Sequence, residues 1–463
     1  MQLKKITLTA LSLVLALSTI TGCSAKKEVA MPETIDIMAE SVLTADDFLK
    51  ASGRDLKNKS GEGDVVNLRG VNFGGLFIQE LWMSPTFTSK NVADQTDILN
   101  VLTERFGEEG TKELIDVWQE NYITEDDFIY LSNLGVNVVR IPFFYRDLMD
   151  TEGNFLGYNE KAGDPYAVAF NRLDKLIAMA GKHGIYVILD CHGAQGSQNG
   201  SDHSGVDGKD DKVGASKFFF GDDAPKNQEQ YYEMWRVIAA RYKGNPIVAG
   251  YDLLNEPYCT YRYNSPNGMS DKALHELLWG IYDKAYDVIK AEDPDHVIIM
   301  EATWDAVDLP NPKDYDWENV MYEYHNYLYD DYDNVGNGQW KSMRTKLEGV
   351  YYANYDVPCF MGEFNYFNSI DAWDSGLDLL TNAGVNWTVW TYKTTSKNGN
   401  WGLFHHPKDM DLGVNIEKKE FDEIKDEWAK VNTSFANENE RLAEVIGKWC
   451  KEEAKPNALG TKK

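Results

Sequence analysis

The fold expected for this chain is decided by Val248-Ala249-Gly250-Tyr251-Asp252-Leu253-Leu254-Asn255-Glu256-Pro257. Most of the first seven residues are apolar, and Asn255-Glu256 then ends the run in front of a proline. Burying a carboxylate without a partner costs free energy or shifts its pKa. The stretch is therefore typical of a buried parallel strand whose carboxyl end opens onto a functional site.

Seven further apolar runs alternate with helical patterns along the chain. Amphipathic stretches such as 170–180 and 274–289, with apolar residues three or four positions apart, separate most of them. Strands that alternate with helices form a parallel sheet, and eight such strands close a barrel. The sequence therefore predicts an α/β fold, the (β/α)8 TIM barrel. The expected strands are 65–73, 136–143, 186–191, 247–254, 297–300, 320–324, 359–361 and 386–390.

Six of these runs end in polar or functional side chains. In a barrel of this kind, the carboxyl ends of all strands meet on one face. Two glutamates stand out: Glu256 ends the run quoted above, and Glu363 follows Pro358-Cys359-Phe360-Met361-Gly362. Carboxyl groups held about 5–5.5 Å apart can cleave a glycosidic bond with retention of configuration. The side chains at these ends are Arg140, His192, Asn255, Glu256, His325, Tyr327, Glu363 and Trp390.

With these residues in this order, residues 65–395 resemble glycoside hydrolase family 5, a family of retaining β-glycosidases with a TIM-barrel fold. Leu68-Arg69-Gly70-Val71-Asn72-Phe73-Gly74-Gly75 and His192-Gly193-Ala194-Gln195-Gly196-Ser197-Gln198-Asn199-Gly200 are similar to its exo-β-1,3-glucanase branch. The resemblance implies a β-glucan oligo- or polysaccharide substrate. It implies no metal and no organic cofactor.

The resemblance also implies a role for each site residue. Glu363 is the expected nucleophile and Glu256 the expected acid/base. The charge of Glu363 and partial desolvation are expected to raise the pKa of Glu256. Glu80 matches the carboxylate that holds a terminal glucose in the exo-acting branch. The expected substrate-binding residues are Glu80, Arg140, His192, Asn255, His325, Tyr327 and Trp390.

Three functions stay open at this point. The first is an exo-acting glucan 1,3-β-glucosidase, and the second is an endo-β-1,4-glucanase of the same fold. The third is an inactive sugar-binding lipoprotein, which the presence of both glutamates disfavours. Leu76 stands where the exo-acting branch usually has tryptophan, and Phe143-Phe144-Tyr145 also departs from that branch. Both departures bear on linkage preference.

The chain begins with a targeting signal. Lys4 and Lys5 precede a mostly apolar stretch over 6–17, and Ile20-Thr21-Gly22-Cys23 follows. This pattern resembles a bacterial lipoprotein signal, so we expect lipidation of Cys23 and an extracytoplasmic protein anchored to a bacterial membrane. A formal net charge of −28 argues against nucleic acid as a partner. We expect a monomer.

These patterns divide the chain into four parts: a signal peptide at 1–22, a tether at 23–43, a single catalytic domain at 44–430, and a C-terminal polar helix and tail at 431–463. Cys191 and Cys359 fall inside expected core strands and are predicted to be buried. The spacing of Cys191, Cys259, Cys359 and Cys450 fits no zinc motif and assigns no disulfide. The Asp-rich stretch 202–211 is either a solvated loop or a calcium site, although its spacing does not match an EF-hand.

Overall fold

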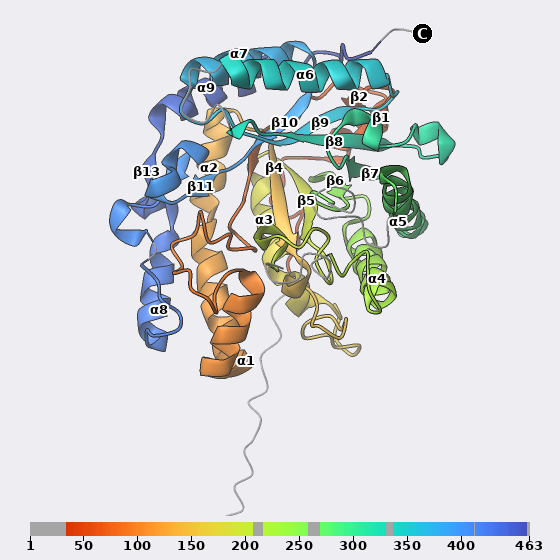
Figure 1. Ribbon diagram of the computed structural model, residues 1–463. Helices are drawn as coiled ribbons and strands as arrows, with labels where there is room; N and C mark the ends of the chain where they lie inside the picture. The colour runs from red at the N-terminus through yellow and green to blue at the C-terminus, as the bar shows by residue number, and fades with distance from the viewer. Residues whose placement is uncertain (1–33, 207–215, 258–268, 330–336, 412, 461–463) are drawn as a thin grey trace, which may run out of the picture.

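A closed barrel of eight parallel strands forms the centre of the molecule, in the order β10-β3-β4-β5-β6-β7-β8-β9 (Figure 1). The computed structural model describes residues 34–206, 216–257, 269–329, 337–411 and 413–460. The predicted (β/α)8 barrel is confirmed, and each predicted run overlaps one barrel strand. The barrel strands are β3 Arg69–Asn72, β4 Val138–Phe144, β5 Tyr186–Gly193, β6 Val248–Asp252, β7 Val297–Glu301, β8 Val320–Asn326, β9 Cys359–Phe364 and β10 Asn386–Val389.

Helices surround the barrel (Figure 1). Local signals set their ends. Helix α2, for example, begins at a capping box in which Thr124 N–H donates to Asp127 Oδ2 over 2.7 Å, and it ends at Gly135 with φ +97°. The helices are α1 Gln95–Tyr122, α2 Glu125–Leu134, α3 Ala167–Lys182, α4 Ala224–Tyr242, α5 Asp271–Glu292, α6 Asn337–Ala353, α7 Ile370–Asn382, α8 Phe421–Trp428 and α9 Glu440–Cys450. In the described part of the chain, none of these helices is both long enough and apolar enough to cross a membrane.

Short strands lie outside the barrel. β1 (Lys50–Ser52) and β2 (Asp55–Lys57) form an antiparallel pair before the first barrel strand. β11 (Lys393–Thr394), β12 (Phe404–His405) and β13 (Asn437–Glu438) form a small sheet that joins the segment after β10 to the C-terminal part. The chain beyond the last barrel strand is thereby fixed to the barrel.

The C-terminal segment closes the amino-terminal end of the barrel. The guanidinium group of Arg69, at the start of β3, donates to the backbone carbonyls of Trp449, Glu452 and Glu453. The backbone N–H of Lys455 donates to Asn67 Oδ1 over 2.8 Å. Helix α9 also packs on α7 and α2. This end of a TIM barrel serves stability rather than chemistry.

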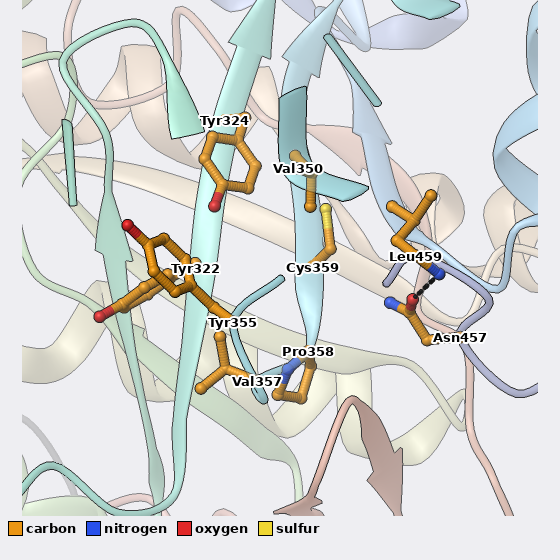
Figure 2. Close-up of a pocket in the computed structure, with 9 residues that line it drawn as sticks. All are labelled: Tyr322, Tyr324, Val350, Tyr355, Val357, Pro358, Cys359, Asn457 and Leu459. Atoms are coloured by element: carbon orange, nitrogen blue, oxygen red, sulfur yellow. Dashed lines mark hydrogen bonds between the residues drawn. The ribbon is translucent and has the colours of Figure 1, made fainter. Parts of the chain in front are cut away.

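A small cavity lies on the outer side of β8 and β9 (Figure 2). Its volume of about 10 Å³ admits about one water molecule. Its lining includes Val350 of α6 and Leu459 of the C-terminal segment, and Asn457 Oδ1 accepts a hydrogen bond from Leu459 N–H. The cavity is a packing defect away from the carboxyl ends of the strands, and no function follows from it.

The predicted division of the chain stays a prediction. Residues 1–33, with Cys23 and the whole signal, lie outside the described residues, as does Cys259. At the end of the predicted tether, the backbone N–H of Val42 donates to the carbonyl of Gly181 in α3 over 3.0 Å. Cys191, Cys359 and Cys450 are buried free thiols, so the predicted burial of the first two is confirmed.

We predict that Arg69→Met lowers the free energy of unfolding by about 3 kcal/mol. The substitution keeps the aliphatic stem but leaves buried carbonyls without a charged donor, and each such bond is worth about 1.5–3 kcal/mol. Urea unfolding followed by far-ultraviolet circular dichroism measures the change. Arg344→Met is the matched control, because that side chain is 57% exposed and makes a surface ion pair with Glu348. Equal unfolding midpoints for the two variants would contradict this role of Arg69.

Candidate active site

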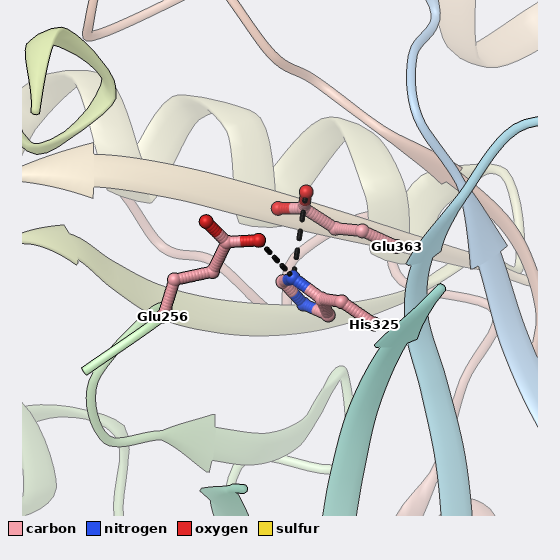
Figure 3. A group of neighbouring side chains, drawn as sticks. All are labelled: Glu256, His325 and Glu363. Carbon is pink, nitrogen blue, oxygen red and sulfur yellow. Dashed lines mark hydrogen bonds and ion pairs between the residues drawn. The ribbon is translucent and has the colours of Figure 1, made fainter. Parts of the chain in front are cut away.

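Glu256, His325 and Glu363 meet at the carboxyl end of the barrel (Figure 3). One ring nitrogen of His325 and one carboxylate oxygen of each glutamate all lie within 4.8 Å of one another. Glu363 belongs to β9 and His325 to β8, whereas Glu256 lies in the segment that follows β6. The two glutamates that the sequence singled out are therefore brought together, with the imidazole between them.

The guanidinium group of Arg140, on β4, is fully buried and connects several strands. Its nitrogens lie 2.8–3.3 Å from side-chain oxygens of Asn72, Asp190, Asp252, Asn255, Glu323 and Glu363. One cation cannot neutralise four buried carboxylates. Burial and the neighbouring acids raise the pKa of both Asp190 and Glu323 well above the ordinary range. The guanidinium group is thus surrounded by more acids than one cation can balance, and burial favours the protonated forms of Asp190 and Glu323.

Glu363 receives hydrogen bonds on both carboxylate oxygens. Arg140 Nη1 donates to Oε1 over 2.9 Å, and the Tyr327 hydroxyl donates to Oε2 over 2.9 Å. The side chain is 6% exposed, so one face of the carboxylate remains accessible. Charge-assisted bonds to a carboxylate favour its ionised form. The surroundings of Glu363 suit a nucleophile.

Asn255 offers a free donor beside the two glutamates. Its Oδ1 accepts from Arg140 Nη2 over 3.0 Å, which fixes the orientation of the amide. The Nδ2 atom is buried and has no hydrogen-bond partner among the described residues. A buried donor without a partner is costly unless a ligand uses it. Asn255 is therefore placed to bind a hydroxyl group at the site.

Glu256 lies in different surroundings from Glu363. Its backbone has φ +39°, in the left-handed region, and its N–H donates to Glu301 Oε2 over 2.6 Å. Its side chain faces two imidazoles: Oε1 lies 3.0 Å from His325 Nδ1, and Oε2 lies 3.3 Å from His203 Nε2. Burial acts to raise the pKa of Glu256, but the hydrogen bonds and charges of His203 and His325 lower it well below the ordinary range. The prediction of a raised pKa is wrong for the unliganded site.

The Nδ1 atom of His325 lies among side-chain oxygens of three glutamates. That nitrogen lies 3.0 Å from Glu256 Oε1, 3.3 Å from Glu301 Oε1 and 3.6 Å from Glu363 Oε2. An imidazole nitrogen among carboxylate oxygens donates a hydrogen bond, and it then has no lone pair for a metal. The carboxyl groups of Glu256 and Glu363 thus both lie close to one imidazole nitrogen.

His192 and Trp390 form the base of the site. The His192 ring stacks on Trp390 with a centroid distance of 5.3 Å and an interplanar angle of 8°. Its Nδ1 lies 2.7 Å from Asp190 Oδ2, and burial and the Arg140 charge lower its pKa well below the ordinary range, which favours a neutral ring. A Cβ at Gly74 would lie 2.7 Å from the Trp390 ring, so glycine leaves room for the indole beside the segment that follows β3.

Glu80, in the segment after β3, lies at one side of the site among aromatic side chains. Its Oε2 accepts from Trp82 Nε1 over 2.7 Å, and Trp82 packs against Trp401 at a centroid distance of 4.8 Å. Burial raises the pKa of Glu80 to about 8, although His203 opposes the shift. In its protonated form, the carboxyl group of Glu80 can both donate and accept a hydrogen bond.

The structure thus gathers Glu80, Arg140, His192, Asn255, Glu256, His325, Tyr327, Glu363 and Trp390 on one end of the barrel. Sequence reasoning missed further polar residues of the same site: Asn72, Asp190, His203, Asp252, Glu301 and Glu323. Some of these had a readable signal, because residues two apart on a strand share a face. Asp190 precedes His192 by two on β5, and Glu323 precedes His325 by two on β8.

Gly362 shows a constraint that no spacing rule could reveal. A Cβ at this position would lie 1.5 Å from Glu323 Oε1. Glycine is required here because the buried carboxyl group of the neighbouring strand occupies that space. Sequence reasoning also missed His203. This residue lies in a polar loop, on the short turn η4 (Asp202–Ser204), where no residue spacing marks it as functional.

Comparison with known proteins agrees with this geometry. Residues 99–396 match the family model described as cellulase (glycosyl hydrolase family 5). A β-xylosidase of Phanerodontia chrysosporium is 30% identical over 283 residues, which cover 60% of this chain and 52% of the relative. A probable glucan 1,3-β-glucosidase A of Aspergillus terreus is 31% identical over 299 residues, which cover 63% of each protein. The matches therefore span between about half and two thirds of these relatives.

A solved structure supports the fold alone. The crystal structure of rutinosidase from Aspergillus niger superposes with a TM-score of 0.56 at 18% sequence identity. The superposition covers 75% of this chain and 97% of the rutinosidase chain. At this identity the likeness concerns the arrangement of the barrel and says nothing about substrate.

Proposed function

The chain belongs to glycosyl hydrolase family 5, and on that premise we propose that it is a retaining β-glycosidase that hydrolyses β-glucans. More narrowly, we propose an exo-acting glucan 1,3-β-glucosidase that works by double displacement. The relative from Aspergillus terreus bears that name, and the site described above provides the side chains that this reaction needs.

The spacing of the two glutamates is the observation on which the proposal rests. One carboxylate oxygen of Glu256 and one of Glu363 lie within 4.8 Å of each other. Retaining enzymes hold their carboxyl groups about 5–5.5 Å apart, whereas inverting enzymes need about 6.5–9.5 Å to admit a water molecule. The short spacing favours direct attack by a carboxylate on the sugar.

In the first step, Glu363 attacks the anomeric carbon. The glycosidic C–O bond breaks, and the leaving oxygen takes a proton that Glu256 delivers. Arg140 and Tyr327 hold the attacking carboxylate in place through the hydrogen bonds described above. The free Nδ2 of Asn255 binds the sugar 2-hydroxyl, a contact expected to strengthen in the transition state.

In the second step, water replaces Glu363 at the anomeric carbon. Glu256, now a carboxylate, accepts a proton from the water, and the sugar leaves with its original configuration. Trp390 provides the apolar surface under the sugar ring, and His192 keeps the indole in position by stacking. All of these steps use side chains of this chain.

Burial of Glu80 supports exo action. The loop that contains His203 continues to Gly205, whose carbonyl accepts from Thr96 Oγ1 over 2.7 Å at the start of α1. Gln79 N–H donates to Gln95 Oε1 over 3.0 Å at the same place. Glu80 and this loop thus lie against one helix end, an arrangement that favours a site closed beyond the first sugar. Glu80 would then bind the terminal glucose.

We further propose that the protein is a monomer held at a bacterial membrane through a lipid on Cys23. The motif Ile20-Thr21-Gly22-Cys23 after a short apolar stretch supports the anchor. Each buried CH₂ of an acyl chain adds about 0.8 kcal/mol of membrane affinity, so two or more chains hold stably. A β-glucan substrate outside the cell fits this location.

We predict that Glu363→Gln reduces hydrolysis of an aryl β-glucoside by about 1000-fold or more, since the substitution removes the nucleophile and each tenfold loss corresponds to about 1.36 kcal/mol. The fold should persist because the side-chain volume is kept. In the wild type, a 2-fluoro-β-glucoside should label Glu363, as mass spectrometry of peptides would detect. Glu62→Gln, at an exposed site, is the control. Substantial activity in purified Glu363→Gln would refute the assignment, and an inactive wild type would favour a sugar-binding protein.

We predict that Glu80→Ala lowers kcat/KM on aryl β-glucosides and on β-1,3-glucan by about ten- to a hundredfold. A sugar hydroxyl left without its buried partner costs about 1–3 kcal/mol. The wild type should release glucose from laminarin before any longer product, as chromatography of early time points would reveal. An aryl β-xyloside should be cleaved more slowly. Early release of mixed oligosaccharides, with Glu80→Ala near wild-type activity, would point to an open endo-acting site.

We predict that Cys23→Ala releases the protein from the membrane fraction of the producing cell, because the acyl chains can no longer be attached. Fractionation followed by immunoblotting measures the distribution. Ser24→Ala, one residue along, is the control and should stay with the membrane. Identical distributions of Cys23→Ala and the wild type would exclude the lipid anchor.

A further inference from the structure

His203 lies beside the carboxyl group of Glu256, but the two steps of double displacement described above do not use it. Its Nε2 is 3.3 Å from Glu256 Oε2, on the side of the carboxyl group away from His325. Its ring packs edge-on against His192 at a centroid distance of 6.1 Å. The proposed acid/base therefore has a second imidazole as a close neighbour.

Asn199 restricts where the proton of this imidazole can be. Its Oδ1 accepts from Ser201 N–H over 2.9 Å, and its Nδ2 donates to the backbone carbonyl of Glu256 over 3.2 Å. Turning the amide over would lose both bonds. The same Nδ2 lies 2.7 Å from His203 Nε2, which is favourable when that nitrogen has no proton. Asn199 thus favours a proton-free Nε2, whereas an ionised Glu256 favours a protonated one.

We propose that Glu256 and His203 share one proton, and that His203 is a positioning residue that keeps this proton available to Glu256 at alkaline pH. The inference rests on the proposed glycosidase function. In the first step the proton moves from Nε2 to Oε2 and then to the leaving oxygen, as the glycosidic bond breaks. In the second step the attacking water returns a proton to the pair. The opposing preferences set by Asn199 and Glu256 make the internal transfer easy.

The surroundings of the pair agree with a stored proton. Burial lowers the pKa of His203, but the hydrogen bond and charge of Glu256, with Glu80 and Asp202, raise it to about 9. The carboxyl group itself has its pKa held low, so the proton rests on the imidazole until it is needed. The titratable groups that face the pair are Glu80, Asp190, His192, Asp202, Glu301, His325 and Glu363.

The test is the pH dependence of kcat/KM for His203→Gln. Glutamine keeps a polar side chain but cannot titrate, so Glu256 alone must hold the proton. On an alkyl β-glucoside, whose leaving group requires protonation, we expect the basic limb of the profile to move down by about one pH unit or more. This shift corresponds to about a tenfold greater loss on the alkaline side than in the wild type. On 2,4-dinitrophenyl β-glucoside, whose leaving group needs no proton, the basic limb of the kcat/KM profile should not move, so the loss should be the same at every pH.

His183→Gln is the matched control, because His183 Nε2 also pairs with a carboxylate, Glu125 Oε1 at 3.0 Å, away from the site. It should follow the wild-type profile. His203→Asn is a second variant in case the first folds poorly. An unmoved basic limb would overturn the proposal, as would equal loss on both substrates at every pH, which would indicate a structural role. A wild type that hydrolyses neither glucoside would instead refute the glycosidase function itself.

Discussion

The buried guanidinium group of Arg140 is the interaction on which the rest of the site depends. A fully buried cation is tolerated only when it is paired and all of its donors are used. Here its partners come from five other segments of the barrel, and they include Asp252, Asn255 and Glu363. Removing the cation would leave several carboxyl groups uncompensated. The same contacts that neutralise the guanidinium also orient Asn255 and hold Glu363, so stability and chemistry share one set of hydrogen bonds.

The two glutamates lie among different neighbours, and this difference fits the different roles proposed for them. Glu363 faces a permanent cation and a phenol, and both stabilise its anion in a fixed orientation. Glu256 faces two imidazoles, whose charge depends on pH. A nucleophile must be ionised throughout the approach of the substrate, whereas an acid/base must gain and lose a proton in each cycle. Imidazoles suit the second requirement, because they exchange protons near neutral pH.

The two ends of the barrel have separate roles: one stabilises the fold, and the other carries the candidate site. At the amino-terminal end, Arg69 donates hydrogen bonds to backbone carbonyls of the C-terminal segment, and these bonds fix that segment to the barrel. At the carboxyl end, side chains from different strands and loops converge around Glu256 and Glu363. Glu256 even has a left-handed backbone, with φ +39°, which its bond to Glu301 holds in place. Strain of this kind is typical of functional positions, and the stable opposite end supports it.

The sequence by itself determined the barrel and singled out Glu256 and Glu363 at strand ends. Eight apolar runs separated by amphipathic helices admit few other folds, and polar residues at strand ends must meet on one face because parallel strands share a direction. Only the tertiary structure decided the proton chemistry. The low pKa of Glu256 depends on His203, which reaches it from a loop with no recognisable spacing. The raised pKa of Glu323 and the need for Gly362 depend on neighbouring strands. Electrostatic interactions depend on distance and burial, and the order of residues along the chain fixes neither.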